Sequence, residues 1–208
     1  GKLSARLDLR EERDVRALRA LASDADVFSQ SYRPGTLAAR GFSPEALAAL
    51  RPGIVCVTLD AWGASGPWRA RRGFDSIVQS VSGMAQDSAG ADGKPRLLPV
   101  SAIDYVSGYL MAFGATVALE RRAREGGSWL VRVALARVGK WIDDLGRAAA
   151  GGADELPQEV LTNLLMETPA PDGRITHLRP VLEMSATPTR WDRPPVPLGY
   201  HPPEWPPR

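Results

Sequence analysis

Strand-like runs and helix-like spacing alternate along the first part of the chain. Residues 54–59 form a short, continuous β-branched run, which is typical of a strand buried on both faces of a parallel sheet. Shorter runs predict strands over 25–30 and 129–133, and apolar residues at helical spacing predict helices over 75–85 and 103–125. This alternation places the fold in the α/β class, with a mostly parallel sheet and flanking helices.

Shorter helices are indicated by weaker apolar spacing and by capping residues. Ser43 and Pro44 are the residue types that favour the N-cap and the first position of a helix. Ser101 and Asp104 are spaced like a capping box at the start of the long helix, with the Asp104 carboxylate accepting backbone N–H groups. These further helices are expected over 7–22, 36–40, 43–50, 140–150 and 156–165.

The C-terminal part has a different composition from the rest. Of the 18 prolines in the chain, 8 follow Thr187, and a short apolar segment over 175–182 precedes them. A proline-rich tail builds neither a helix nor a sheet, so we expect it to lie extended along a surface. The chain of 208 residues is therefore divided into an α/β core over 1–137 and a segment of linker helices and wrapping tail over 138–208.

Composition excludes several classes of partner and compartment. Lys and Arg total 26 against 24 for Asp and Glu, and a net charge of +2 is too small to bind nucleic acid through its phosphates alone. No window approaches the ~18 apolar residues of a membrane span, and the N-terminus has no signal-like stretch. The single cysteine, Cys56, excludes a disulfide framework. We therefore expect a cytoplasmic protein without a membrane or nucleic-acid partner.

Few residues in the sequence carry recognisable chemistry. His177 and His201 have no Ser, Cys or paired carboxylate near them in sequence, so neither a histidine-based triad nor a metal site is predicted. The glycine-containing stretch over 61–73 lacks the spacing of a phosphate-binding loop. Asp104 has two interpretations that both stay open: it is a helix cap, or it is a nucleophile toward an activated acyl group.

Short motifs follow one another in a specific order over residues 2–137. They include Tyr32-Arg33-Pro34-Gly35, Gly63-x-x-Gly66-Pro67, Arg72-Gly73-Phe74-Asp75, Asp92-Gly93-x-Pro95 and Ile103-Asp104-x-x-x-Gly108. This succession resembles the family III CoA-transferases, the CaiB/BaiF group. The resemblance implies a Rossmann-like large domain and the transfer of coenzyme A (CoA) between carboxylic acids.

The same resemblance assigns roles to individual residues. Asp104 matches the aspartate that attacks the acyl-CoA thioester, which gives a mixed anhydride and then an aspartyl-CoA thioester. CoA is thus a substrate, no tightly bound cofactor is implied, and the partners are an acyl-CoA, a carboxylic acid and a second copy or partner half in an interlocked dimer. The residues implied to contact CoA are Ser31, Tyr32, Arg33, Arg40, Arg72 and Phe74.

Departures from the family pattern support two alternative hypotheses. Arg40 is displaced by one position from the family's arginine, where this chain has Ala39, and the family's opening strand and small domain with its glycine-rich loop are absent from the sequence. The chain is therefore also interpreted as a non-catalytic structural half of a tandem CoA-transferase. A 2-methylacyl-CoA racemase is the third hypothesis, and it is disfavoured because Phe74 replaces the proton-transferring histidine of that branch.

Overall fold

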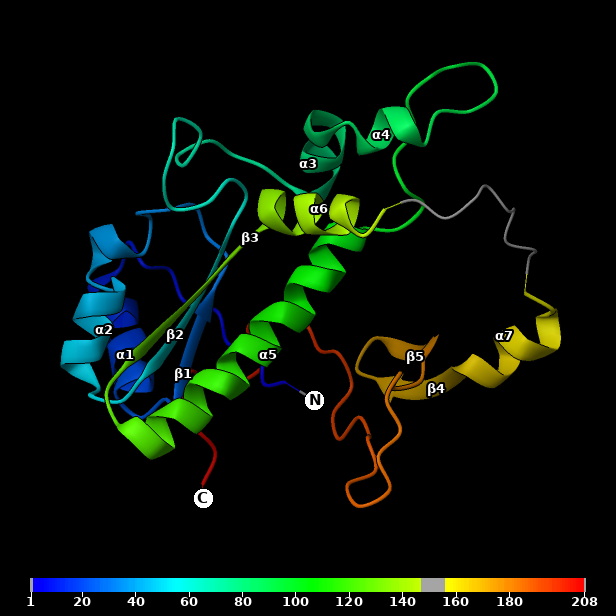
Figure 1. Cartoon of the computed structure of the whole chain (residues 1–208). Helices are drawn as coiled ribbons and strands as arrows, with labels where there is room; N and C mark the ends of the chain where they lie inside the picture. Colours follow the sequence, from blue (N-terminus) through cyan, green and yellow to red (C-terminus); the bar gives the residue numbers. More distant parts are fainter. Residues whose placement is uncertain (1, 147–155, 208) are drawn as a thin grey trace. The chain divides into compact units, whose positions relative to one another are not determined.

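The structure is a computed structural model that describes residues 2–146 and 156–207, and Figure 1 traces the chain through them. It divides into two compact units. Arg19–Ala148 form the larger unit, and Gly1–Leu18 together with Ala149–Arg208 form the smaller one. The larger unit contains the parallel sheet, so it is described first.

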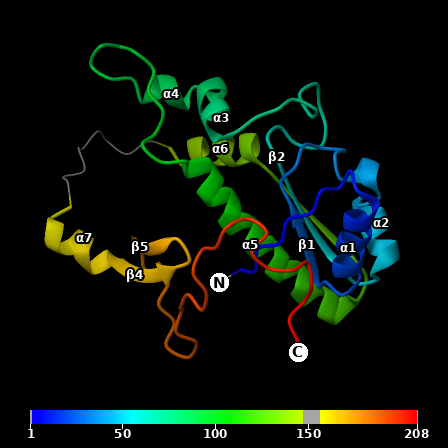
Figure 2. The same ribbon diagram turned by 180° about the vertical axis from the view of Figure 1, so that it is seen from behind.

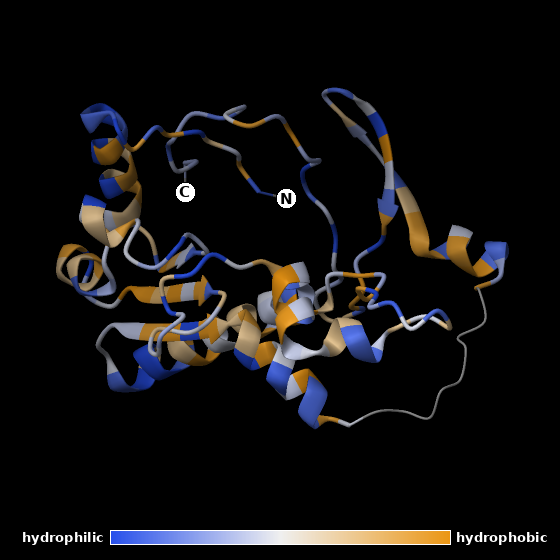
Figure 3. Ribbon diagram, turned by 90° about the horizontal axis from the view of Figure 1, so that it is seen from above, coloured by the Kyte–Doolittle hydropathy of each residue, from blue (hydrophilic) through white to orange (hydrophobic). Residues whose placement is uncertain are grey.

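Three parallel strands form this sheet, in the order β1-β2-β3. Val55 of the middle strand pairs with Val27 on one side and with Trp129 on the other. Residues 54–57 are at most 3% exposed, so the middle strand is buried as its apolar run predicts, and the sheet is coloured mostly hydrophobic in Figure 3. The α/β class and all three predicted strands are confirmed, as β1 (Val27–Gln30), β2 (Val55–Asp60) and β3 (Trp129–Ala134).

The side chains of β2 alternate between the two faces of the sheet, and each face has its own cover. Val55 and Val57 pack against Ala118 of the long helix α5 (Ala102–Glu125). On the other side of the sheet lies α2 (Pro44–Leu50), as Figure 2 shows from behind. The Ser43 hydroxyl caps α2 by accepting the N–H of Ala46 at 3.2 Å, so that predicted cap is confirmed.

The long helix approaches β3 very closely at a glycine. A Cβ atom built on Gly114 would lie only 2.6 Å from Cγ1 of Val131, closer than two carbon atoms can approach. Nearer its N-terminus, α5 contributes Ile103 to a second buried cluster with Val78 and Val138. These two regions of packing fix both ends of α5 on the larger unit.

Helix boundaries differ from the predicted ones on both sides of α5. The helix predicted over 75–85 is split into α3 (Asp75–Ser82) and α4 (Met84–Asp87), because Gly83 adopts a left-handed conformation with φ of +91°. α6 (Leu135–Asp144) begins directly after β3, earlier than the helix predicted over 140–150. Its early start buries Leu135 and Val138 in the Ile103 cluster, and positions 147–150 of that prediction lie outside the described residues.

The N-terminal helices are shorter than predicted. α1 (Glu12–Ser23) starts after a turn in which the Asp14 carboxylate accepts the N–H of Asp8 at 2.8 Å, so the helix expected over 7–22 begins late. The helix expected over 36–40 is a short 3-10 turn, η1 (Ala38–Arg40), which ends at Gly41 with φ of +85°.

The smaller unit contains a hairpin that the sequence analysis missed. β4 (Leu165–Ala170) pairs antiparallel with β5 (Gly173–Leu178), after the short helix α7 (Gln158–Leu164). Residues 179–207 form neither helix nor strand, as expected for the proline-rich tail. The division predicted after residue 137 stays a prediction.

α5 also corrects one expectation about apolar windows. Within the described residues, it is the one helix with the length and composition of a membrane span, with a mean hydropathy of 1.3 over its best window. Small residues and tyrosines separate the aliphatic side chains of this window, so it does not form a continuous apolar run in the sequence. One such helix is weak support for a membrane, since a core helix of a soluble protein meets the same criteria.

The close approach of α5 to β3 predicts a stability effect. Gly114→Ala should lower the free energy of unfolding by about 1–3 kcal/mol, because the added methyl group overpacks against Val131. The matched control is Gly108→Ala in the same helix, where nothing but the adjacent backbone of α5 lies within 4 Å of the new Cβ. That control should stabilise the chain by up to about 1 kcal/mol. Urea denaturation measures both, and equal effects would contradict the packing.

Candidate functional site

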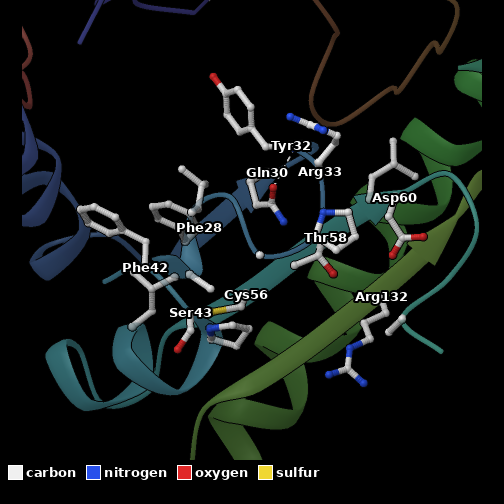
Figure 4. A pocket seen from close by; sticks show the side chains of 18 of the residues that line it. Phe28, Gln30, Tyr32, Arg33, Phe42, Ser43, Cys56, Thr58, Asp60 and Arg132 are labelled. Atoms are coloured by element: carbon white, nitrogen blue, oxygen red, sulfur yellow. Dashed lines mark hydrogen bonds between the residues drawn. The ribbon is translucent and has the colours of Figure 1, made fainter. Parts of the chain in front are cut away.

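A cavity of about 420 Å³ opens at the carboxyl ends of β1 and β2, and Figure 4 shows the side chains around it. In open α/β sheets this edge is where ligands bind. The side chains of β2 that line it are Cys56, Thr58, Leu59 and Asp60. Three of these alternate with Val55 and Val57, so most of the cavity wall belongs to the face of the sheet that α5 does not cover.

The cavity is lined by three arginines, Arg33, Arg69 and Arg132, and by one carboxylate, Asp60. Guanidinium groups suit phosphates because they donate paired hydrogen bonds in a fixed plane. The Asp60 carboxylate accepts the N–H of Gly63, which holds the start of the following loop. We name this cavity with its three arginines the arginine pocket.

Two further lining residues have settled roles. The Gln30 side chain accepts the N–H of Tyr32 at 2.8 Å, which fixes the turn that carries Tyr32 and Arg33 into the arginine pocket. Burial raises the pKa of the Cys56 thiol to about 11, so it stays protonated and unreactive near neutral pH.

The predicted CoA-contacting residues are distributed unevenly around this pocket. Tyr32 and Arg33 line it, whereas Ser31, Arg40, Arg72 and Phe74 do not. The Phe74 ring is 69% exposed, directly before α3. The Arg72 side chain is exposed as well. The backbone carbonyl oxygen of Arg72 accepts the indole N–H of Trp62 at 3.2 Å.

Two of the three arginines, Arg69 and Arg132, are not among the residues that the family resemblance implies to contact CoA, and Arg132 was missed altogether. Arg132 is the one charged residue in the apolar strand 129–134. A charged residue inside an otherwise apolar strand indicates a face of the sheet with a function. Arg69 lies in the loop between β2 and α3. That loop is packed by the edge-to-face rings of Trp62 and Trp68, whose centroids are 5.0 Å apart.

Asp104 lies in the first turn of α5, away from the arginine pocket lining. Its side chain is exposed, and within the described residues its carboxylate accepts no hydrogen bond. Its backbone N–H donates to Oδ2 of Asp75 at 3.0 Å. Partial desolvation and, secondly, the neighbouring Asp75 carboxylate raise the pKa of Asp104.

The predicted capping box is therefore wrong. Ser101 occupies the N-cap position of α5 with ψ of 64°, far from the extended backbone of an ordinary N-cap, and its side chain makes no capping hydrogen bond. Asp75, from a different helix, caps α5 instead. The Asp104 carboxylate consequently remains available for chemistry.

The two histidines have structural partners in the smaller unit. Nε2 of His177 lies 2.8 Å from the Thr168 hydroxyl, and Nδ1 of His201 accepts the N–H of Ser4 at 3.0 Å. Among the described residues, no group of three or more His, Cys, Asp or Glu side chains could hold a metal ion.

Residues 1–145 match the sequence profile of CoA-transferase family III. The chain belongs to this family. This family member is 34% identical over 135 residues to the probable fatty acyl-CoA transferase Rv3272 of Mycobacterium tuberculosis, and the matched residues are 65% of this chain and 34% of that protein. It is 31% identical, over the same shares, to succinyl-CoA–D-citramalate CoA-transferase of Chloroflexus aurantiacus.

Solved structures of the family agree with the fold. A crystal structure of Rv3272 superimposes with a TM-score of 0.64 at 33% identity, covering 70% of this chain and 41% of that one. A CaiB/BaiF family protein from Brucella suis has the same TM-score at 23% identity, which supports the fold alone, over 84% of this chain and 47% of that one. The match thus spans about a third of the length of the curated relatives.

The environment of Asp104 predicts its titration. The Asp104 carboxyl should titrate above the ordinary aspartate value of 3.8, and Asp75→Asn should lower that midpoint because it removes a neighbouring negative charge. Since the fold favours the protonated form, the contribution of Asp104 to stability is lost as pH rises through its raised pKa. Carbon-detected NMR of the side-chain carboxyl measures the midpoint.

The control for this titration is Glu45→Gln, on α2 across the sheet from α5. It should leave the Asp104 midpoint unchanged. A midpoint that Asp75→Asn does not move would contradict the coupling of the two carboxylates.

Proposed function

We propose that this chain carries the nucleophile and part of the CoA site of an enzyme that transfers CoA from an acyl-CoA thioester to a carboxylic acid. Membership of the family supports the reaction class. One observation carries the assignment of the nucleophile: within the described residues, the Asp104 carboxylate at the start of α5 accepts no hydrogen bond, and Asp104 lies in the segment that matches the family. Its raised pKa makes the carboxylate more basic, and therefore a better nucleophile.

The proposed reaction proceeds through two covalent intermediates on Asp104. A carboxylate oxygen attacks the thioester carbonyl carbon, the carbon–sulfur bond breaks, and the CoA thiolate leaves behind an aspartyl-acyl anhydride. The thiolate then attacks the Asp104 carbonyl carbon of the anhydride, and the donor acid departs as its carboxylate. The acceptor carboxylate displaces CoA from the resulting aspartyl thioester. Attack of the released thiolate on the acceptor acyl carbon gives the new acyl-CoA and restores Asp104.

The arginine pocket is proposed to hold the phosphate-bearing nucleotide of CoA. Arg33, Arg69 and Arg132 supply the positive charge that phosphates require. The pocket lies mainly on the face of the sheet opposite α5, whereas Asp104 starts α5 at the same carboxyl edge. CoA has its phosphates and its thiol at opposite ends of a long pantetheine arm, and this arm is proposed to cross the sheet edge toward Asp104.

A second candidate function is that of a non-catalytic half which supports an active partner half. It is favoured by the absence of Asp104 from the arginine pocket lining. Either function is compatible with a second copy or partner half. One relative, the succinyl-CoA–L-malate CoA-transferase of Chloroflexus aurantiacus, has subunits named alpha and beta.

The nucleophile is tested by trapping. Incubation of the chain with an acyl-CoA and hydroxylamine should convert the Asp104 carboxyl into a hydroxamate, because hydroxylamine attacks the anhydride or thioester carbonyl carbon on that residue. Peptide mass spectrometry locates the modification. Asp104→Asn should abolish it, and Asp172→Asn in the β4–β5 turn should leave it intact. Absence of any hydroxamate in the unaltered chain would favour the structural half.

The arginine pocket is tested by CoA affinity. Arg33→Ala, Arg69→Ala and Arg132→Ala should each weaken CoA binding roughly 10- to 100-fold, the cost of losing about 1.5–3 kcal/mol of charged hydrogen bonding. Pantetheine, which lacks the nucleotide, should bind all variants alike. Isothermal titration calorimetry provides the affinities.

The control for these variants is Arg124→Ala, whose guanidinium pairs with Glu120 near the end of α5. Arg72→Ala tests the alternative nucleotide site, which the family resemblance places at Arg72 and which lies outside the arginine pocket lining. If only Arg72→Ala weakens binding, the arginine pocket is not the nucleotide site.

A further inference from the structure

The buried carboxylate of Asp75 uses both of its oxygens on neighbouring parts of the fold. Asp75 opens α3 and is only 4% exposed. Its Oδ2 accepts the backbone N–H of Asp104 at 3.0 Å, and its Oδ1 accepts the side-chain N–H of Gln79. Among the described residues it has no ion pair, although a buried carboxylate is costly unless it is well satisfied by hydrogen bonds.

Gln79 extends this contact to a third segment. It lies one turn after Asp75 in α3, is 2% exposed, and accepts the backbone N–H of Leu98 with its Oε1 at 2.8 Å. Leu98 lies just ahead of Ser101, the N-cap residue of α5. The pair of side chains therefore ties the loop that enters α5 and the first turn of α5 to the same helix, α3.

The apolar cluster beneath this network makes it stiff. Val78, between the two polar residues in α3, is 1% exposed and packs with Ile103, which is fully buried next to Asp104. α3 thus contacts the start of α5 through an apolar side chain on one side and through the Asp75 carboxylate on the other. A rigid support of this kind is what a reacting group needs to keep its position.

From this geometry we infer that Asp75 and Gln79 are positioning residues for Asp104: Asp75 takes over the capping of α5, so that the Asp104 carboxylate is left free to react from a fixed backbone. This inference rests on the proposed function, in which Asp104 is the nucleophile. Asp75 does not line the arginine pocket, so its effect is on acylation of Asp104 and not on CoA affinity.

The first test removes the cap. Asp75→Ala should slow the formation of the Asp104 hydroxamate at saturating acyl-CoA by about 10- to 100-fold, the scale of a misplaced reacting group. CoA affinity by calorimetry should remain unchanged. Amide hydrogen exchange at Asp104 should accelerate, because its N–H loses its acceptor.

The second test exchanges the two side chains. In the double variant Asp75→Asn with Gln79→Glu, the amide oxygen of residue 75 can still accept the Asp104 N–H, and its NH₂ group can donate to residue 79. The carboxylate at position 79 can still accept the Leu98 N–H. Every hydrogen bond is thus restored, and trapping should return to within a few-fold of the unaltered rate. Asp75→Asn alone should trap more slowly, because it forces Gln79 to release either Leu98 or residue 75.

The matched structural control is Val81→Ala, which shortens an α3 side chain that is 51% exposed and lies outside the cluster of Val78 and Ile103. The folded variant should keep its trapping rate. If Asp75→Ala forms the hydroxamate at the unaltered rate, the inference is overturned. Should Asp75→Ala fail to fold, the same outcome in the single variant Asp75→Asn overturns it.

Failure of the proposed function gives a different pattern. The unaltered chain then forms no hydroxamate at all, while hydrogen exchange at Asp104 still reports whether Asp75 holds this backbone. Unchanged exchange at Asp104 in Asp75→Ala overturns the positioning role independently of activity.

Discussion

The start of α5 depends on a carboxylate from another helix. Most helices cap themselves with a side chain from their own N-terminal segment, and the sequence around Ser101 suggests such a cap. In the folded chain Asp75 supplies the acceptor instead. Because this acceptor comes from α3, the geometry at Asp104 is a property of the packed larger unit, not of the local sequence. The start of α5 depends on α3 through apolar contacts as well, because Ile103 of α5 packs against Val78 of α3 in a buried cluster.

The sheet itself could be predicted from the sequence because its signals are local. A continuous β-branched run at 54–59 indicates a buried strand whatever surrounds it, and the long apolar helix after it is equally plain. The end of α3 could be anticipated less well, since Gly83 in a helical pattern is compatible with either a continuous helix or a left-handed break. The β4–β5 hairpin was missed because Pro169 and Pro171 look like loop punctuation, whereas a two-stranded hairpin tolerates prolines at its edges.

The candidate site could be predicted only where a motif names the residue. Asp104, Tyr32 and Arg33 belong to ordered motifs, and the structure places the last two at the arginine pocket. Arg132 and Arg69 belong to no motif, and they reach the pocket through strand pairing and loop packing, which are long-range effects. The partnership of Asp75 with Asp104 is of the same kind, because 29 positions separate two residues that share a hydrogen bond.

The strict alternation of β2 has a consequence for how such a protein can diversify. Val55 and Val57 serve the contact with α5, while Cys56, Thr58 and Asp60 face the cavity. One short strand therefore carries two sets of positions with separate structural roles. Side chains that line the cavity can change without disturbing the packing of the long helix, so the shape and charge of the cavity can vary on an unchanged scaffold.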